Sequence, residues 1–580
     1  MFSKAEKKLN FCDVIFLIAT TLVGGFNEHI SCLLSCALLV YLFVKYTSKK
    51  ELCYSHSLFA VSVTVICLAY GLTCFWAIDS GMAFIGFLKF LPILLYFVAM
   101  QQSEKKIGVL NFIPYFAAVL VIVSAIGAQI PGVKSLFLIA GRFAGVFQYP
   151  NTFALFLLIC ELLLLKKFKF RIFDCISMII LAGGVFYTGS RTVFVLFFLA
   201  NFVLLLALVK KSVRIAIIIS SVVAAFALVG LLYVFRDNPI ASRYLNMDFG
   251  ASTFVGRLLY FVDALPLIFK YPFGMGYMGY YYVQHTVQTG VYNVIYAHND
   301  FLQLFLDVGI IPAALFIAAV GKYFFDKKVR LAQKIIVATF CLHTLFDFNL
   351  QYIAMFWFLI ILMSEGEAKS EKEETKPKSK KKSVPDDIRV IKKSVVVKPL
   401  MIVLFVVNLY MAVALALAYY NVNDPAFAMY PYNTRCNLVI LEQEEDLQEA
   451  NELADHIIKQ NDNYFAPYSV KSKYAYSKGD FVGVINNKHE VFARYPFRYT
   501  EYKEYCTMLI NGAIAFAEQG DVKSANICND EVIATAERLA SNKDRLSKLG
   551  KMIDEQPVLR ISKNILEYID KLKEEQVTDN

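Results

Sequence analysis

The sequence predicts an all-α fold: a polytopic transmembrane helical bundle followed by a soluble α-helical domain. Of the 580 residues, 57% are hydrophobic and only 18% are charged. Apolar runs of about 16 to 22 residues recur along the chain, close to the length at which a helix crosses a bilayer. Lys and Arg cluster between alternate runs, so membrane topology explains the net charge of +10 better than a nucleic-acid partner does.

The first apolar run follows the basic segment MFSKAEKKLN without a convincing cleavage site, which favours a retained helix over a signal peptide. Because the backbone in lipid must satisfy its own hydrogen bonds, each run is expected to be helical. Thirteen spans are expected, at 10–26, 30–46, 57–77, 83–100, 109–130, 150–165, 172–189, 193–209, 215–235, 303–321, 332–347, 350–363 and 400–420.

Charge bias predicts the orientation of these spans. With a cytoplasmic N-terminus, the basic connections 49–50, 105–106, 166–171, 210–214 and 322–330 all fall on the cytoplasmic side. An arginine that stands on the outer side against this bias suggests a task there, although each one could instead anchor at lipid headgroups. The polar groups expected outside are Arg142, Arg191, Arg243, Arg257 and His298.

The longest outer connection, about 236–300, is too long and too apolar for a simple turn. After Gly256-Arg257, apolar residues recur with helical spacing, which predicts a helix at the membrane surface that holds Arg257 at headgroup depth. They are Leu258, Leu259, Phe261, Val262, Leu265, Ile268 and Phe269.

In the same loop, Gly274-Met275-Gly276-Tyr277-Met278-Gly279 has the spelling of a dinucleotide-binding motif. No β-α-β pattern surrounds it, so these glycines are interpreted as turn residues.

Composition divides the rest of the chain. Residues 1–363 form the predicted membrane catalytic domain, and 364–399, rich in Lys, Glu, Ser and Pro, a disordered cytoplasmic linker able to touch anionic lipid. The span 400–420 carries the chain outside. The tail 421–580 has helical periodicity, punctuated by Gly479-Asp480 and Gly520-Asp521, and resembles tetratricopeptide-type hairpins. Such an array offers a surface for a protein partner.

Arginine forks match phosphate oxygens and stabilise a diphosphate leaving group, and a histidine can take a proton from an attacking hydroxyl. An outer set of Arg and His therefore suits glycosyl transfer from a lipid diphosphate. A site for a metal or a cofactor is not expected.

Five segments resemble the O-antigen ligase and polymerase superfamily, bacterial membrane glycosyltransferases that take glycans from undecaprenyl diphosphate on the outer face of the cytoplasmic membrane. The likeness covers roughly 10–363. The segments are Gly141-Arg142-Phe143-Ala144-Gly145-Val146-Phe147 with Pro150-Asn151, Thr188-Gly189-Ser190-Arg191-Thr192, Gly256-Arg257 with Tyr271-Pro272-Phe273-Gly274-Met275-Gly276, Ala297-His298-Asn299-Asp300-Phe301-Leu302-Gln303, and His343-Thr344-Leu345-Phe346-Asp347-Phe348.

The resemblance implies a GT-C-like fold and a metal-independent, inverting reaction. By it, Arg191 and Arg257 hold the diphosphate of the undecaprenyl-linked glycan donor, and His298 activates the acceptor hydroxyl. Arg142, Arg243 and Asn299 are added as substrate-binding residues. The acceptor is a glycan, a lipid or a protein hydroxyl, and the large outer tail is a feature shared with related protein O-oligosaccharyltransferases.

Several alternatives stay open at this point. His298-Asn299-Asp300 could only cap a helix, and His343 and Asp347, four residues apart, could be a structural pair or metal ligands. Lys89 lies in an apolar run without a partner that the sequence identifies. At the level of function, the rivals are a transporter or flippase for lipid-linked sugars and a non-catalytic scaffold.

Overall fold

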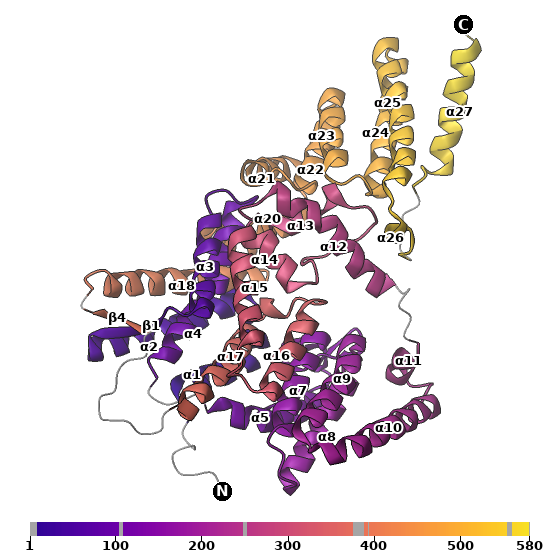
Figure 1. The fold of residues 1–580 in the computed structure, drawn as a ribbon. Coiled ribbons are helices and arrows are strands. Elements are labelled where there is room, and N and C mark those ends of the chain that lie inside the picture. The colour runs from indigo at the N-terminus through magenta and orange to yellow at the C-terminus, as the bar shows by residue number, and fades with distance from the viewer. Residues whose placement is uncertain are drawn as a thin grey trace. The chain divides into compact units, whose positions relative to one another are not determined.

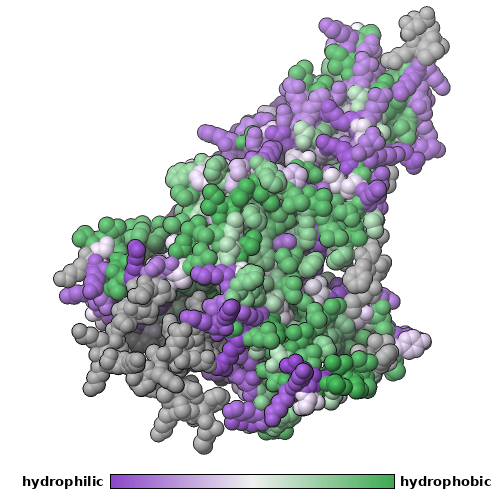
Figure 2. Space-filling model, in the orientation of Figure 1, coloured by the Kyte–Doolittle hydropathy of each residue, from purple (hydrophilic) through white to green (hydrophobic). Residues whose placement is uncertain are grey.

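The computed structural model describes residues 9–103, 108–246, 252–374, 388–392, 394–553 and 559–578. These residues are overwhelmingly α-helical, which confirms the predicted all-α class (Figure 1). The described strands form two antiparallel pairs, β1 (Glu51–Ser55) with β4 (Ile388–Lys392) and β2 (Leu138–Ile139) with β3 (Arg142–Phe143). Hydrophobic residues dominate the visible surface of the apolar helices in Figure 2, whereas the last helices are largely hydrophilic.

The chain divides into two compact units, each assembled from segments distant in sequence. The first unit comprises Met1–Gly71, Ile85–Asp248 and His298–Ala416. Its helices are α1 (Phe11–Thr21), α2 (Glu28–Lys49), α3 (Leu58–Thr73), α4 (Ser80–Gln101), α5 (Val109–Gly127), α6 (Lys134–Phe137), α7 (Pro150–Leu165), α8 (Ile172–Tyr187), α9 (Arg191–Leu208), α10 (Arg214–Val234), α11 (Pro239–Leu245), α14 (Asp300–Val308), α15 (Ile310–Phe325), α16 (Leu331–Thr344), α17 (Ile353–Glu374) and α18 (Val397–Tyr419), of which α3, α4 and α18 run past the boundary at one end.

Two helices that are apolar on every side form the core of the first unit. All residues of α7 from Pro150 to Leu164 are buried, and so is α17 from Ile353 to Met363. Trp357 of α17 stacks on Tyr96 of α4, with ring centroids 4.2 Å apart, and its indole N–H donates to the Pro92 carbonyl at 3.1 Å. A helix without a polar face is stable only when it is surrounded, and the outer helices provide that surrounding.

Five described helices are long and apolar enough to cross a membrane: α2, α4, α5, α9 and α18. Seven shorter apolar helices, of 10–17 residues, lie at other predicted spans. The protein is a multi-pass membrane protein, and the number of thirteen crossings stays a prediction.

The predicted single span 303–321 is wrong, because the chain breaks at Gly309. That residue adopts φ 87° and ψ 179°, a conformation essentially limited to glycine, and separates α14 from α15. Pro312, in the first turn of α15, is tolerated because its missing N–H is not needed there. The apolar run continues through the break, so periodicity gave no sign of it.

The predicted disordered linker 364–399 is wrong in part. Helix α17 continues to Glu374, and Ile388–Lys392 forms β4 in register with β1, with Cys53 opposite Val390. The run 388–392 contains three β-branched residues, Ile388, Val390 and Ile391, a strand signal that the Lys-rich composition obscured. The rest of the linker, 375–387 and 393, lies outside the described residues.

Lys89, for which the sequence identified no partner, is fully buried in α4. Its ammonium lies 4.6 Å from the centre of the Phe26 ring, and its charge acts on the carboxylate of Asp307 in α14. Asp307 also accepts hydrogen bonds from Tyr70 at 2.9 Å and from Gln303 at 2.8 Å. Lys89 on α4 and Asp307 on α14 are therefore buried residues of opposite charge within the first unit.

The second unit comprises Leu72–Phe84, Phe249–Ala297 and Leu417–Asn580. Its helices are α12 (Ser252–Lys270), α13 (Gly279–Val287), α19 (Asn423–Met429), α20 (Thr434–Gln443), α21 (Leu447–Gln460), α22 (Ala466–Ser477), α23 (Phe481–Arg494), α24 (Tyr499–Glu518), α25 (Val522–Ser541), α26 (Lys548–Lys551) and α27 (Lys563–Thr578). Most of the predicted outer loop, Phe249–Ala297, thus belongs with the C-terminal helices, whereas α11 belongs to the first unit.

Successive C-terminal helices pack on one another, α21 on α22, α22 on α23 and α24 on α25. The predicted punctuation is confirmed: Gly479 and Gly520 have positive φ, and the carboxylates of Asp480 and Asp521 cap the helices that follow. The tetratricopeptide resemblance stays a prediction.

Contacts within the second unit bind both Leu72–Phe84 and the outer loop to these helices. The buried carboxylate of Asp79 accepts from Gln460 Nε2 at 3.0 Å and from Asn461 Nδ2 at 3.1 Å. His285 of α13 stacks on Tyr495, with ring centroids 3.9 Å apart. Gly274 and Gly276 have positive φ before α13, as expected of turn residues, whereas Gly279 is the first residue of α13.

Candidate functional site

Five segments, from four connections that the charge bias assigns to one side of the membrane, converge in the first unit. They are the segment after α5 that contains Arg142, the α8–α9 turn, α11, the start of α14, and the segment between α16 and α17. Polar side chains from these segments hydrogen bond to residues of neighbouring elements.

Three predicted arginines, Arg142, Arg191 and Arg243, are linked through backbone carbonyls. The Nε of Arg142 donates to Thr188 O at 3.0 Å, that of Arg243 to Gly189 O at 2.8 Å, and that of Arg191 to Arg243 O at 3.1 Å. These bonds fix each side chain through Nε. In the described chain, the terminal nitrogens of Arg191 and Arg243 form no hydrogen bond, and no carboxylate forms an ion pair with any of the three.

Electrostatics make this arginine cluster, defined as Arg142, Arg191 and Arg243, a place for an anion. Burial, assisted by Arg243, lowers the pKa of Arg142 to about 10, and burial together with Arg191 lowers the pKa of Arg243. Arg191 is the first residue of α9, where the helix dipole disfavours a cation and favours an anion. A phosphate group at the cluster would relieve both penalties.

His298 lies beside a fully buried carboxylate. Its Nδ1 is 3.4 Å from Oδ1 of Asp347, and its side chain is 20% exposed while that of Asp347 is 0% exposed. The His298 ring meets the Phe348 ring edge-on, with centroids 5.0 Å apart. His298 also has φ 53°, a left-handed conformation that is uncommon for a non-glycine residue.

Asp347 connects His298 to the arginine cluster. Its carboxylate accepts from Tyr149 O–H at 2.9 Å and from Asn151 Nδ2 at 2.7 Å, and Asn151 Oδ1 accepts from Arg142 at 2.7 Å. A continuous chain of polar contacts therefore runs from Arg142 through Asn151 and Asp347 to His298. A buried network of this kind holds its members in one arrangement.

His343 and Asp347 do not share a helix face as expected, because α16 ends at Thr344 and Asp347 lies beyond its end. His343 Nδ1 instead forms a hydrogen bond with Asn349 Nδ2 at 2.9 Å, and Asn349 Oδ1 accepts from Thr152 at 3.0 Å. These bonds hold the segment that carries Asp347. Within the described ranges, no group of three or more His, Cys, Asp or Glu is arranged to hold a metal ion.

Two predicted residues have other surroundings. Asn299 caps α14, since its Oδ1 accepts from Leu302 N at 3.0 Å. Arg257 lies half-buried on α12 in the second unit, whereas the contacts among Arg142, Arg191 and Arg243 are all within the first.

Sequence reasoning missed the roles of Tyr149, Asn151 and Asp347. Asn151 and Asp347 stood inside the family-like segments, and an aspartate between two phenylalanines was a usable signal, because an acid in an apolar stretch is costly unless it serves a purpose. Nothing in the sequence indicated which base it would contact.

Comparison with known proteins relates part of the chain to a described family. Residues 176–317 match the family described as O-Antigen ligase, a range that contains Arg191, Arg243, Arg257 and His298. No curated protein matches the chain. The role that follows from the match is that of a surface-polysaccharide ligase or polymerase. Residues 176–317, 142 of the 580 in this multi-pass membrane protein, thus match the O-antigen ligase family.

Proposed function

We propose that the protein transfers a glycan from an undecaprenyl-diphosphate-linked donor to an acceptor hydroxyl on the outer face of the cytoplasmic membrane. The observation that carries the proposal is the polar chain from the arginine cluster to His298, with Nδ1 of His298 3.4 Å from the buried carboxylate of Asp347. It joins an anion-binding surface to a base in one unit.

The arginine cluster would bind the diphosphate of the donor. The terminal nitrogens of Arg191 and Arg243 offer forked donors, and the start of α9 offers a positive dipole end. As the glycosidic bond breaks, its electron pair goes to the diphosphate oxygen, and these fixed charges stabilise the negative charge that develops there.

His298 would act as the general base. The carboxylate of Asp347 faces Nδ1 of the His298 ring, and this contact would orient Nε2 toward the substrate. Nε2 takes the proton of the acceptor hydroxyl while its oxygen attacks the anomeric carbon opposite the leaving diphosphate, which inverts that centre. No metal enters these steps.

Arg257 is proposed to bind the same diphosphate, because it matches the family pattern. Asn299 is proposed to contact the substrate in addition to capping α14. The orientation remains the one that charge bias favours, with the N-terminus cytoplasmic and the C-terminal helices outside. The convergence of segments from four predicted outer connections on one site is consistent with that topology.

Purified protein in lipid nanodiscs, supplied with a defined undecaprenyl-diphosphate oligosaccharide, would test the proposal. The His298→Ala and Arg191→Ala proteins are each expected to lose transfer by about 100-fold or more, the usual contribution of a general base or of an oriented charge. Arg236→Ala is the matched control, because Arg236 is exposed and contacts only the Tyr233 ring.

The mass of the product identifies the acceptor class. A ladder of repeats indicates a polymerase, a single addition a ligase, and glycan on a polypeptide a protein O-oligosaccharyltransferase. Turnover by His298→Ala at the wild-type rate would remove the base role. Movement of intact lipid-linked glycan across the bilayer, without cleavage of the diphosphate bond, would favour the transporter instead.

A further inference from the structure

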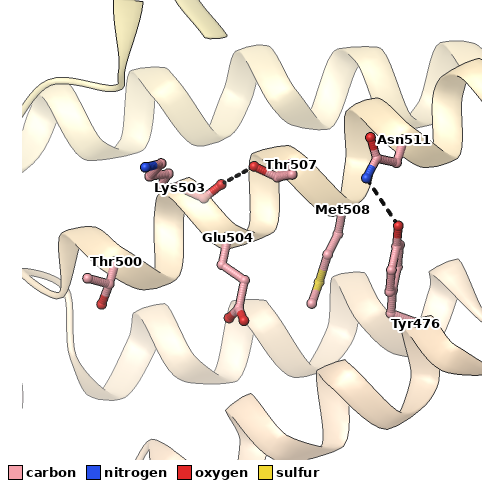
Figure 3. Close-up of a pocket in the computed structure, with 7 residues that line it drawn as sticks. All are labelled: Tyr476, Thr500, Lys503, Glu504, Thr507, Met508 and Asn511. Carbon is pink, nitrogen blue, oxygen red and sulfur yellow. Dashed lines mark hydrogen bonds between the residues drawn. The ribbon is translucent and has the colours of Figure 1, made fainter. Parts of the chain in front are cut away.

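A groove in the second unit, with a volume of about 340 Å³, lies between α22 and α24 (Figure 3). It is remote in sequence from every residue proposed for catalysis. Tyr476 lines it from the end of α22. The other side chains follow one face of α24 at helical spacing, namely Thr500, Lys503, Glu504, Thr507, Met508 and Asn511.

The apolar part of the groove is a rigid surface. Met508 is 8% exposed, and the Tyr476 ring packs against Phe481 with centroids 5.8 Å apart and planes at 80°. Phe481 is itself held in place, because it contacts Phe516 and covers Gly512, where any Cβ would overlap its ring. The Tyr476 ring is therefore preorganised before any ligand arrives.

Neutral hydrogen-bonding groups surround this apolar surface. Asn511 Nδ2 donates to the Tyr476 hydroxyl at 3.3 Å, which leaves the Tyr476 O–H and the Asn511 carbonyl oxygen to bind a ligand (Figure 3). The Thr507 hydroxyl donates to the Lys503 carbonyl at 2.9 Å, so its oxygen can still accept. Thr500 adds an exposed hydroxyl.

The carboxylate in the groove is already neutralised. The Glu504 carboxylate lies 2.7 Å from the ammonium of the buried Lys488. It also lies 3.3 Å from the ammonium of the exposed Lys473. Although burial acts in the opposite direction, Lys488 lowers the pKa of Glu504 below its usual value. Glu504 is thus a fixed acceptor rather than a site for a cation or for a basic peptide.

We propose that this groove binds a segment of glycan, so that the C-terminal helices hold the polysaccharide whose transfer is proposed above, on which this inference rests. A sugar ring has an apolar C–H face, which fits Tyr476 and Met508, and a rim of hydroxyls, which fits Asn511, Thr507 and Glu504. A peptide held by its apolar side chains would need enclosed apolar pockets, whereas this groove offers one aromatic ring with polar side chains and the exposed Lys503 around it.

The experiment uses the full-length protein in nanodiscs and a fluorescently labelled oligosaccharide released by mild acid from the surface polysaccharide of the source strain. Tyr476→Ala and Asn511→Ala are each expected to weaken binding about tenfold, the effect of losing one ring contact or one hydrogen bond. Tyr476→Phe keeps the ring and is expected to retain part of the affinity.

Tyr474→Ala is the matched control, because Tyr474 lies on the same helix but hydrogen bonds to Gln448 outside the groove. It is expected to bind like the wild type. His298→Ala is also expected to bind normally, since the groove does not contain the proposed base. Circular dichroism of each variant confirms that the helices remain folded.

Unchanged affinity in folded Tyr476→Ala and Asn511→Ala would overturn the proposal, as would competition by peptides and not by oligosaccharide. If no oligosaccharide binds while transfer still depends on His298, the groove proposal fails and the proposed function stands. If glycan binding depends on Tyr476 while transfer does not depend on His298, the groove proposal stands and the proposed base role of His298 fails.

Discussion

Gly189 illustrates how a single residue sets the geometry of the arginine cluster. It has φ 62°, and a Cβ there would lie 3.2 Å from Arg243 Cδ and 3.7 Å from Arg142 Nε. Its carbonyl accepts from Arg243 at 2.8 Å. Because Gly189 has no side chain, Arg142 and Arg243 can both approach the turn before α9. This close approach, together with the positive φ, accounts for a glycine at this position.

At this scale the sharpest prediction concerns Asp347. Asp347→Asn keeps the size of the side chain but loses the charge that faces His298 Nδ1, so the ring is no longer held in the orientation that exposes Nε2. Single-turnover transfer from the lipid-linked donor is expected to fall by about 100-fold. Asp237→Asn, an exposed aspartate in the same unit, is the control. A folded Asp347→Asn protein with wild-type turnover would show that Asp347 has only a structural role.

Helix α12 shows how one element serves two surfaces. Val255 and Leu259 are buried in a cluster with Tyr292 and Ile553 of the same unit. The predicted apolar stripe is divided, because Val262, Leu265 and Phe269 are 52%, 49% and 78% exposed. The exposed residues keep the helical spacing typical of contact with a membrane surface, which stays a prediction.

The break between α14 and α15 gives the element-scale prediction. Gly309→Ala places a Cβ at φ 87° and ψ 179°, which is expected to destabilise the protein by about 1 to 3 kcal/mol and to lower its apparent Tm in detergent. Gly321→Ala is the control, since Gly321 lies inside α15 and an added Cβ meets no atom within 4 Å. There, the better helix propensity of alanine should leave the Tm unchanged or raise it. Equal effects of the two substitutions would contradict the proposed strain.

At the scale of the whole molecule, the outer loop and the C-terminal helices fold as one unit. The Thr289 hydroxyl donates to the Asp263 carboxylate at 2.7 Å and its oxygen lies 3.0 Å from the Ser547 hydroxyl, and Ser547 N donates to the Thr289 carbonyl at 2.9 Å. Gly290 approaches Gly550 so closely that neither position has room for a side chain. These contacts join segments about 250 residues apart in the chain.

Deletion of residues 421–580 is therefore expected to expose the buried faces of α12 and α13. Limited proteolysis of the truncated protein should cut within 252–297 at least tenfold faster than in the full chain, because local opening no longer costs the packing energy. The matched control is cleavage within 322–330, a connection of the first unit, which should not change. Equal cleavage of the outer loop in both proteins would contradict the shared unit.

His285 predicts a pH dependence of the second unit. Burial lowers the pKa of His285 from 6.5 to about 4, so the folded state favours the neutral ring that stacks on Tyr495. The corresponding stability is complete above pH 6.5 and is lost as the pH falls toward 4, by on the order of 3 kcal/mol. Hydrogen exchange in α13 should therefore accelerate across that range. His285→Phe should remove the acceleration, and an unchanged profile in that variant would assign it to other groups.

Local sequence patterns determined a large part of this protein. Apolar runs predicted the helices within a few residues, because hydrophobic length and the need to satisfy backbone hydrogen bonds act locally. Charge bias and the family-like segments identified Arg142, Arg191, Arg243 and His298, which the first unit brings into one network.

Only the tertiary structure decided three other features: the pairing of His298 with Asp347, the break at Gly309, and the grouping of the outer loop with the C-terminal helices. The first and third depend on contacts between residues far apart in the chain, which no window of periodicity contains. The break depends on a single backbone conformation, that of Gly309. Composition sets what is buried, while long-range packing decides which buried groups meet.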